Sequence, residues 1–432
     1  MIGDLKRITK SSFFRNVMVV ASGTAGAQAI SMAFSPLITR LYGPENYGIM
    51  GTFMAGLTML APLAALGYPT AIVLPKDGAR AVGLIKLSLW IALITSTILL
   101  IALFVAGEQI GRSMNISVLG SYIYLLPLAM FFSACLAIST QYVIREKLFA
   151  IRAKAAVAQA LLVGAFKVGA GIISPTAIVL VALSGLASLV HTLFILLGLK
   201  RAGVRLPSLG PEPRLMEVAD QYRDFPVYRA PQNFINAVSQ GLPVLLLASL
   251  SGAAAAGFYS LARTVLILPV NLVANSVGEV FYPHVTEAFH QHKKQAPLII
   301  KATMVLGFIS AAPFAIVFLI GPWLFGWVFG SDWVLAGEYA RWLSLMMFFN
   351  FINKPSVAAI PVLGLQRGLL IYEVFSTGAK LLALYLGFVV FDDALLAIVI
   401  FSLSGAGAYV VLIIWTVVCA WNSDRKRASP LV

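Results

Sequence analysis

Four cationic side chains lie within long apolar segments of the sequence: Lys167, Arg263, Lys354 and Lys380. An ionised side chain at the centre of a membrane costs about 2.5–3.5 kcal/mol, so each cation needs a reason to be there. Arg can bind a phosphate with two parallel hydrogen bonds, and Lys acts as a mobile point charge. Arg263, Lys380 and Lys167 are therefore candidate ligands for an anionic group. The alternative is that each reaches a membrane interface or pairs with an acid, and Lys354 fits an interface better.

Two acidic residues, Glu279 and Glu373, also fall within apolar segments. Glu373 precedes Lys380 by seven residues, so in a helix the two share one face, two turns apart. A buried carboxylate can bind a proton or a cation, which makes both acids candidate ion-coupling residues. The alternative is a charge partner near the cytoplasmic surface, and we favour this interpretation.

Uncharged polar and aromatic residues offer a second kind of contact. Gln28 and Asn271 can hydrogen-bond a polar substrate, or they can join neighbouring helices. Tyr259 lies one helical turn before Arg263, on the same helix face, and can stack on a ring of a bound substrate. Three tryptophans near the end of one apolar segment fit an interfacial belt better than a binding site: Trp323, Trp327 and Trp333.

The sequence lacks the motifs of the common catalytic sites. It contains no P-loop pattern, no convincing dinucleotide fingerprint and no HExxH motif. His284, His290 and His292 lie in a polar segment, where a solvated turn explains them better than a metal site. Cys135 and Cys419 lie in apolar runs and are expected to be small buried hydrophobes. We therefore expect no metal, no cofactor and no enzymatic activity.

These candidates must be positioned by membrane helices. The chain has 432 residues, of which 60% are hydrophobic and only 11% charged, against about 25% charged in soluble domains. This composition excludes a soluble domain, a disordered chain and a secreted disulfide scaffold. A spanning helix takes about 20 residues, and the apolar segments allow twelve. The net charge of +14 does not indicate nucleic acid binding, because the cations cluster in the loops between apolar segments.

We predict an all-α polytopic membrane protein of about twelve transmembrane helices in two pseudo-repeated six-helix bundles. Residues 1–199 form the N-terminal bundle, 200–229 a cytoplasmic linker, and 230–432 the C-terminal bundle with a short basic cytoplasmic tail. With the N-terminus in the cytoplasm, most of the 31 Lys and Arg residues fall on the cytoplasmic side. The bias predicts that both termini are cytoplasmic.

The two halves share glycines and prolines at nearly constant spacing. Residues of the first half recur in the second with shifts of 207–209 positions: Gly43, Gly48, Pro62 and Pro75 as Gly252, Gly257, Pro269 and Pro283. Each half has an even number of spans, so both halves enter the membrane from the same side. The repeat is therefore predicted to be parallel, about an axis along the membrane normal.

The same segments carry a resemblance to a known family. They are Leu41–Ile49 (LYGPENYGI) and Gly67–Thr70 (GYPT) in the first half, and Ala256–Ala262 (AGFYSLA) and Phe281–Pro283 (FYP) in the second. In these motifs, and in span number and loop lengths along the whole chain, the sequence resembles the polysaccharide transporters of the multidrug/oligosaccharidyl-lipid/polysaccharide flippase superfamily. Within it, the chain is most similar to the Wzx-type O-antigen and exopolysaccharide flippases. The motifs mark helix turns rather than a chemical site.

The resemblance implies two bundles around a central cavity that opens alternately to each side of the bacterial cytoplasmic (inner) membrane. Such proteins move undecaprenyl-diphosphate-linked oligosaccharide from the cytoplasmic to the outer leaflet. A polysaccharide polymerase and a chain-length regulator are the protein partners that this role suggests.

Two other functions remain open. A drug or cation exporter of the same superfamily favours an anionic cavity, whereas the charge within these spans is mainly positive. A membrane polymerase or ligase of the polysaccharide pathway needs a substantial outer loop or outward-facing acids and histidines, and the outer loops here are short.

Overall fold

The computed structural model describes residues 12–113, 117–204, 215–276, 281–291 and 293–428, and within them the chain is helical with no strand. Nine of the described helices are long and apolar enough to cross a membrane. Two of these, α2 (Ser12–Ala64) and α9 (Ala230–Ser276), are broken in the middle and account for two crossings each. With α12 (Val334–Ile352), the described residues make twelve crossings, six in each half, which confirms the predicted architecture.

Both long helices break at equivalent glycines. Gly43 in α2 has φ 68° and ψ 174°, and Gly252 in α9 has φ 84° and ψ 178°. A positive φ is strained for residues that carry a Cβ, so glycine is needed where the helix axis changes direction. The two glycines are related by the predicted repeat, and the repeat therefore extends to the backbone conformation.

The two broken helices also pack against each other through small residues. A Cβ on Gly48 would clash with the carbonyl oxygen of Ala253, and a Cβ on Gly257 would clash with the carbonyl oxygen of Pro44. In the predicted repeat, Gly257 is the counterpart of Gly48, and Ala253 is the counterpart of Pro44. The two contacts are therefore equivalent under the repeat, and in both the glycine lies directly against the backbone of the other segment.

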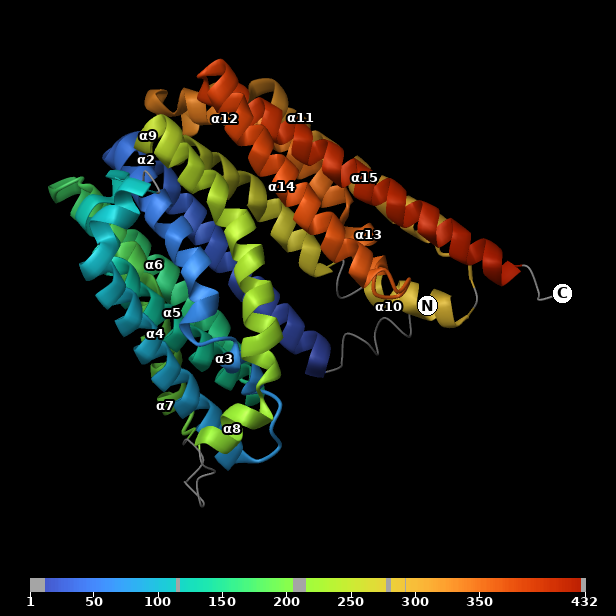
Figure 1. The fold of residues 1–432 in the computed structure, drawn as a ribbon, viewed down its shortest axis with the longest axis horizontal. Coiled ribbons are helices and arrows are strands. Elements are labelled where there is room, and N and C mark those ends of the chain that lie inside the picture. Colours follow the sequence, from blue (N-terminus) through green and yellow to red (C-terminus); the bar gives the residue numbers. More distant parts are fainter. Residues whose placement is uncertain (1–11, 114–116, 205–214, 277–280, 292, 429–432) are drawn as a thin grey trace. The chain divides into compact units, whose positions relative to one another are not determined.

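We call the parts of α2 and α9 before and after their glycine breaks the first and second arms. The first compact unit comprises Met1–Gly257 and so includes the first arm of α9. Four helices pack against α2 (Figure 1): α4 (Gly78–Ser113), α5 (Leu126–Arg145), α6 (Phe149–Ile173) and α7 (Ala177–Arg201). A 3₁₀ segment, η1 (Ser117–Leu125), precedes α5. Phe53 of α2 is fully buried against α5 and α7, and this cluster is the core of the unit. The sequence-based division at 200–229 stays a prediction.

Three short helices lie at one end of this unit: α3 (Tyr68–Ala71), α8 (Leu215–Gln221) and the π-helix η2 (Phe225–Arg229). α8 belongs to the segment predicted as a linker, yet it is docked, because Val218 is 1% exposed in a cluster with α3 and α4. The Tyr68 hydroxyl donates a hydrogen bond to the Ala219 carbonyl at 3.2 Å. Burial and the nearby Asp220 carboxylate raise the pKa of Tyr68, so the hydroxyl keeps the proton that it donates at neutral pH.

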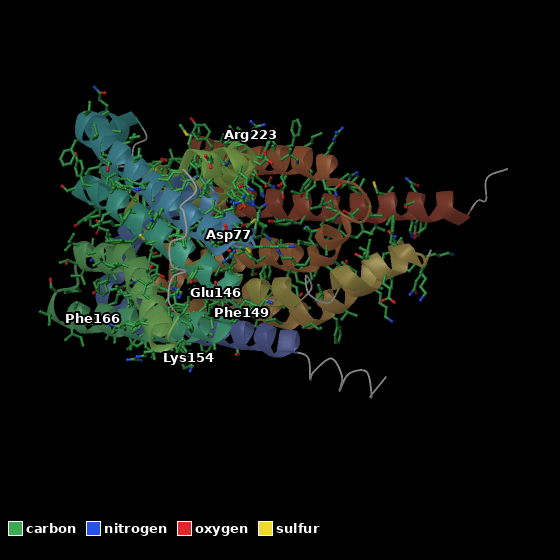
Figure 2. The ribbon with its side chains drawn as sticks, turned by 90° about the horizontal axis from the view of Figure 1, so that it is seen from below. Asp77, Glu146, Phe149, Lys154, Phe166 and Arg223 are labelled. Carbon is green, nitrogen blue, oxygen red and sulfur yellow. The ribbon has the colours of Figure 1, made fainter. Side chains whose placement is uncertain are left out.

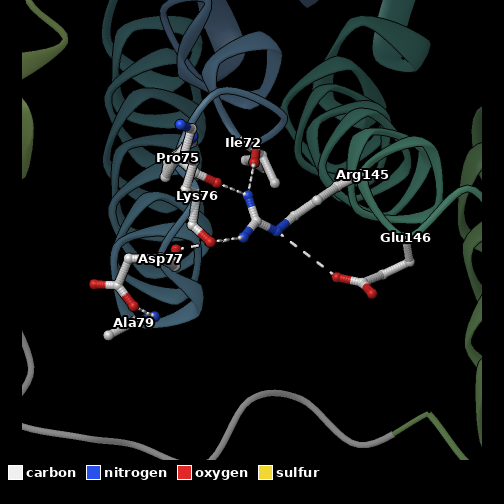
Figure 3. A network of polar contacts seen from close by, with 7 residues as sticks. All are labelled: Ile72, Pro75, Lys76, Asp77, Ala79, Arg145 and Glu146. Carbon is white, nitrogen blue, oxygen red and sulfur yellow. Dashed lines mark hydrogen bonds and ion pairs between the residues drawn. The ribbon is translucent and has the colours of Figure 1, made fainter.

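Arg145, at the end of α5, holds the loop between α3 and α4 (Figure 3). Its guanidinium donates hydrogen bonds to four backbone carbonyls of this segment, those of Ile72, Pro75, Lys76 and Asp77. It also pairs with Glu146 at 3.7 Å, and its side chain is only 13% exposed. Figure 2 views this end of the unit, where Asp77, Glu146 and Arg223 come from different segments. Charged residues and their backbone partners therefore fasten the loops at this end.

The second compact unit comprises Phe258–Val432. Beyond the second arm of α9 and α12, its elements are α10 (Tyr282–His290), α11 (Ala296–Phe329), η4 (Ser331–Trp333), α13 (Lys354–Ala359), α14 (Gln366–Phe391) and α15 (Ala394–Ala428). α11, α12, α14 and α15 pack together. Asp424 of α15 accepts hydrogen bonds from the backbone N–H of Gln295 and Ala296 at 2.9–3.0 Å. This carboxylate caps the start of α11 from a different helix.

Large apolar side chains cover much of the outer surface of the helices. Val105, Ile173 and Phe308 are 82%, 86% and 87% exposed, and all three lie on predicted spans. Exposing such large apolar side chains is unfavourable in water and favourable in lipid. Trp323 and Trp327 are stacked, with ring centroids 6.1 Å apart, and both are exposed, as an interfacial belt requires. Trp333 is 1% exposed, so its predicted belt position is wrong.

Candidate functional site

In the second unit, polar and charged side chains gather around Tyr409 of α15. We define the Tyr409 cluster as six residues from four helices: Tyr259, Arg263, Asn350, Glu373, Lys380 and Tyr409. Asn350 of α12 donates a hydrogen bond from Nδ2 to the Tyr409 hydroxyl at 2.7 Å. Lys380 of α14 places its Nζ 5.5 Å from the centroid of the Tyr409 ring. Tyr409 therefore contacts an amide with its hydroxyl and a cation with its ring.

Lys380 and Glu373 form the charged face of α14. They are two turns apart and interact electrostatically, as the sequence spacing predicts. Glu373 is exposed, whereas Lys380 is half-buried. The ring of Tyr409 offers its negative face to the ammonium group, an interaction worth about 0.5–2 kcal/mol. Lys380 therefore lies over an aromatic ring that stabilises its positive charge.

Arg263 comes from the second arm of α9, one turn after Tyr259. It is half-buried and interacts electrostatically with the hydroxyls of Tyr259 and Tyr409. Tyr259 itself is 2% exposed, and its ring meets Phe401 edge to face at 6.3 Å. In this conformation the Tyr259 ring packs the helices together and is closed to a sugar ring.

Lys167 lies in the first unit, on α6. Its Nζ is 3.8 Å from the Met50 sulfur, a weak acceptor, and its carbonyl accepts a hydrogen bond from Tyr42 at 2.7 Å. A half-buried ammonium group beside a thioether is poorly compensated. The structure thus places Lys167 in one unit and the cations Arg263 and Lys380 in the other.

The remaining predicted residues are only partly described. Gln28 lies on α2, and its Oε1 atom is buried without a hydrogen-bond partner in the described part of the chain. Asn271 belongs to α9, but its side chain lies outside the described residues, and Glu279 lies outside them altogether. The predicted solvated turn at His284, His290 and His292 also falls on side chains outside them. Their roles stay predictions.

Two members of the cluster were not anticipated from the sequence. Asn350 is a lone amide in the run MMFFNF, and Tyr409 is a lone hydroxyl between small residues in GAGAY. A polar atom in the middle of an apolar segment is a usable signal, because it must find a partner in the membrane. The sequence does not reveal that each is the partner of the other.

The cluster combines two cations, a carboxylate, an amide and two phenols. Arg and Lys together can bind a phosphate-bearing anion, and the carboxylate limits the net positive charge. Among the described residues, no group of three His, Cys, Asp or Glu side chains is close enough to hold a metal ion. The arrangement suits binding and release of an anion.

A model of the family described as polysaccharide biosynthesis protein matches residues 37–338, more than half of the chain. The chain belongs to this family. Comparison with curated proteins finds no significant match.

Solved structures similar to this polysaccharide biosynthesis family member are transporters. One is described as the inward-facing conformation of a multidrug resistance MATE family transporter of the MOP superfamily. It has a TM-score of 0.73 and 17% identity, covering 93% of this chain and 96% of that one. The outward-facing conformation of such a transporter gives a TM-score of 0.62 and 15% identity, covering 96% of each chain.

A third structure comes from Pyrococcus furiosus and is described as a MOP superfamily transporter whose reverse polarity of the binding pocket suggests a different function. Its TM-score is 0.59 with 15% identity, covering 96% of each chain. The three similarities show that this family member has the twelve-helix fold of these transporters.

Proposed function

We propose that this protein is a flippase that moves undecaprenyl-diphosphate-linked oligosaccharide, an O-antigen or exopolysaccharide repeat unit, from the cytoplasmic to the outer leaflet of the bacterial inner membrane. The observation that carries the proposal is the Tyr409 cluster. It places Arg263 and Lys380 within membrane-spanning helices of a polysaccharide biosynthesis protein that has a transporter fold. A diphosphate is the anionic group that such a lipid carrier presents.

The mechanism follows from where the charges lie. The diphosphate enters the protein while the prenyl chain stays in lipid, and Arg263 and Lys380 bind the phosphate oxygens. Differential binding in the inward-open and outward-open states, or an ion bound at Glu373, sets the direction. The membrane potential, negative inside, favours outward movement of an anion by about 2.3 kcal/mol per charge per 100 mV. Both termini are cytoplasmic in this proposal.

The test is to delete the gene and measure the lipid-linked oligosaccharide in each leaflet, with and without the gene restored. We expect it to accumulate in the cytoplasmic leaflet and to redistribute when the intact gene returns. A carrier lipid that is normally distributed but unpolymerised contradicts the proposal and supports a polymerase or ligase. An unchanged lipid distribution together with altered drug sensitivity supports an exporter.

A further inference from the structure

The first unit contains a widely open cavity of about 490 Å³ between the second arm of α2, α5 and the first arm of α9, and Thr58, Asn236 and Gln240 in its lining are exposed. Sites for small molecules in proteins measure about 300–1,000 Å³, so the cavity is large enough for a ligand. Its polar lining consists of two hydroxyls and three carboxamides: Thr58, Ser133, Asn233, Asn236 and Gln240. No ionisable side chain lines it, and the Tyr409 cluster belongs to the other unit.

The lining follows one face of each long helix. On α9 the polar residues occupy positions 233, 236 and 240, with Ala237 between them, the spacing of neighbours on one helix face. α2 presents positions 54, 57, 58 and 61 with the same spacing, mostly apolar. One wall therefore carries amides and the opposite wall carries apolar surface. A sugar ring has the same division, with hydroxyls at its rim and C–H groups on its faces.

The hydrogen bonds inside the cavity indicate which groups it can accept. Thr58 Oγ1 donates to the Met54 carbonyl, and Ser133 Oγ to the Met130 carbonyl, both at 2.7 Å. Each hydroxyl proton is therefore used, and each oxygen presents lone pairs as an acceptor. Gln240 Nε2 donates to Asn236 Oδ1 at 2.7 Å, so the Asn236 amide keeps its N–H groups as donors. A ligand that both donates and accepts hydrogen bonds matches this mixture.

Gly241 brings the two walls together. A Cβ at this position would lie 2.8 Å from Met59 Cγ and 3.1 Å from the Ala55 carbonyl oxygen, too close for any side chain without movement. The absence of a side chain lets α9 approach α2 directly beside Gln240. The close approach at Gly241 therefore sets the spacing of the two helix backbones at this end of the cavity.

We propose that this cavity binds an uncharged sugar residue of the transported oligosaccharide through its hydroxyl or acetamido groups. The proposal rests on the proposed flippase function and assigns it a second recognition site. A phosphate requires an excess of donors and a drug cation requires an acid or an aromatic cage, and the cavity has neither. A neutral, polyhydroxylated group is the chemistry that remains.

The test compares two soluble probes, farnesyl diphosphate and farnesyl diphosphate linked to N-acetylglucosamine. Affinities are measured calorimetrically with the full chain in nanodiscs free of glycoside detergents, which would compete for the site. The unmodified protein is expected to bind the sugar-bearing probe more tightly. The double variant Asn233→Leu/Asn236→Leu is expected to weaken that probe about 10- to 100-fold, since each amide contact is worth about 0.5–1.5 kcal/mol, and to leave farnesyl diphosphate unaffected.

Two controls accompany the double variant. Gln232→Leu removes a carboxamide from the same helix outside the cavity and is expected to leave both affinities unchanged. Asn236→Ala alone is expected to weaken the sugar-bearing probe about 3- to 10-fold, and it replaces the double variant if that protein elutes as an aggregate.

The outcomes separate the two proposals. Equal affinity of the unmodified protein for both probes, or an equal loss for both probes in the amide variant, overturns the sugar site and leaves the flippase function standing. If Arg263→Ala/Lys380→Ala binds farnesyl diphosphate normally, diphosphate recognition by the Tyr409 cluster fails, while a sugar preference of the amide cavity still stands.

Discussion

The amide-lined cavity of the first unit and the Tyr409 cluster of the second differ in the chemistry that they offer. The cavity presents hydroxyls and carboxamides against an apolar wall and has no ionisable group in its lining. The cluster presents two cations and a carboxylate around an aromatic ring. A lipid-linked oligosaccharide has the same two parts, a charged diphosphate and an uncharged glycan. The comparison suggests that each unit recognises one part of the substrate.

The largest effect is expected when the positive charge of the cluster is removed. Arg263→Ala/Lys380→Ala should reduce transport about 100-fold or more, because each charge-assisted hydrogen bond to phosphate is worth about 1.5–3 kcal/mol. The measurement is flipping of a lipid-linked oligosaccharide in proteoliposomes, normalised to the amount of folded protein. Arg223→Ala is the matched control, since this cation is 74% exposed and lies in an exposed ion pair. Full activity in both single variants and in the double variant removes these cations from the site.

A smaller effect is expected at Tyr409, where the ring and the hydroxyl can be separated. Tyr409→Leu should reduce transport about tenfold, because Lys380 loses the ring over which it lies. Tyr409→Phe keeps the ring and leaves only the Asn350 amide without its acceptor, so a loss of about threefold is expected. Initial flipping rates in proteoliposomes distinguish the two variants. Equal losses would mean that the ring does not hold the cation for binding.

The smallest effect is expected at Glu373, where the comparison can be sharpened. Glu373 is exposed and interacts with Lys380, so as a charge partner its replacement by Gln should change the rate by no more than about twofold. The pH dependence of transport should stay the same. Transport that loses its response to an imposed pH gradient would instead make Glu373 the coupling site, and the cluster would then bind both an anion and a proton.

The overall fold was predictable because the membrane imposes it. Segments of about 20 apolar residues must be helical in lipid, and glycine and proline mark their breaks, so twelve crossings and the repeat followed from the sequence. The shared helix face of Glu373 and Lys380 was also predictable from helical spacing, and the two interact electrostatically. Trp333 shows the limit: it follows Gly330 with φ 116° and a 3₁₀ turn, which places its side chain inside the protein and not at the interface.

The sites were predictable only where their members share a helix. Asn350 and Tyr409 lie on α12 and α15, 59 residues apart, and their contact depends on how these helices are rotated against each other. The rotation of one helix against another cannot be deduced from a single sequence. The cavity amides at positions 233, 236 and 240 do share a helix face. The sequence does not show that this face lines a cavity together with the apolar face of α2.

The reciprocal packing of Gly48 on Ala253 and of Gly257 on Pro44 has a consequence for the origin of the chain. The residue that each half contributes to one contact has its counterpart in the other contact. Two identical subunits of a two-fold symmetric dimer make contacts of this kind. A shorter ancestor with six spans would have formed it with a second copy of itself, using a single glycine in each subunit. Gene duplication and fusion would then have turned one interface into an internal one.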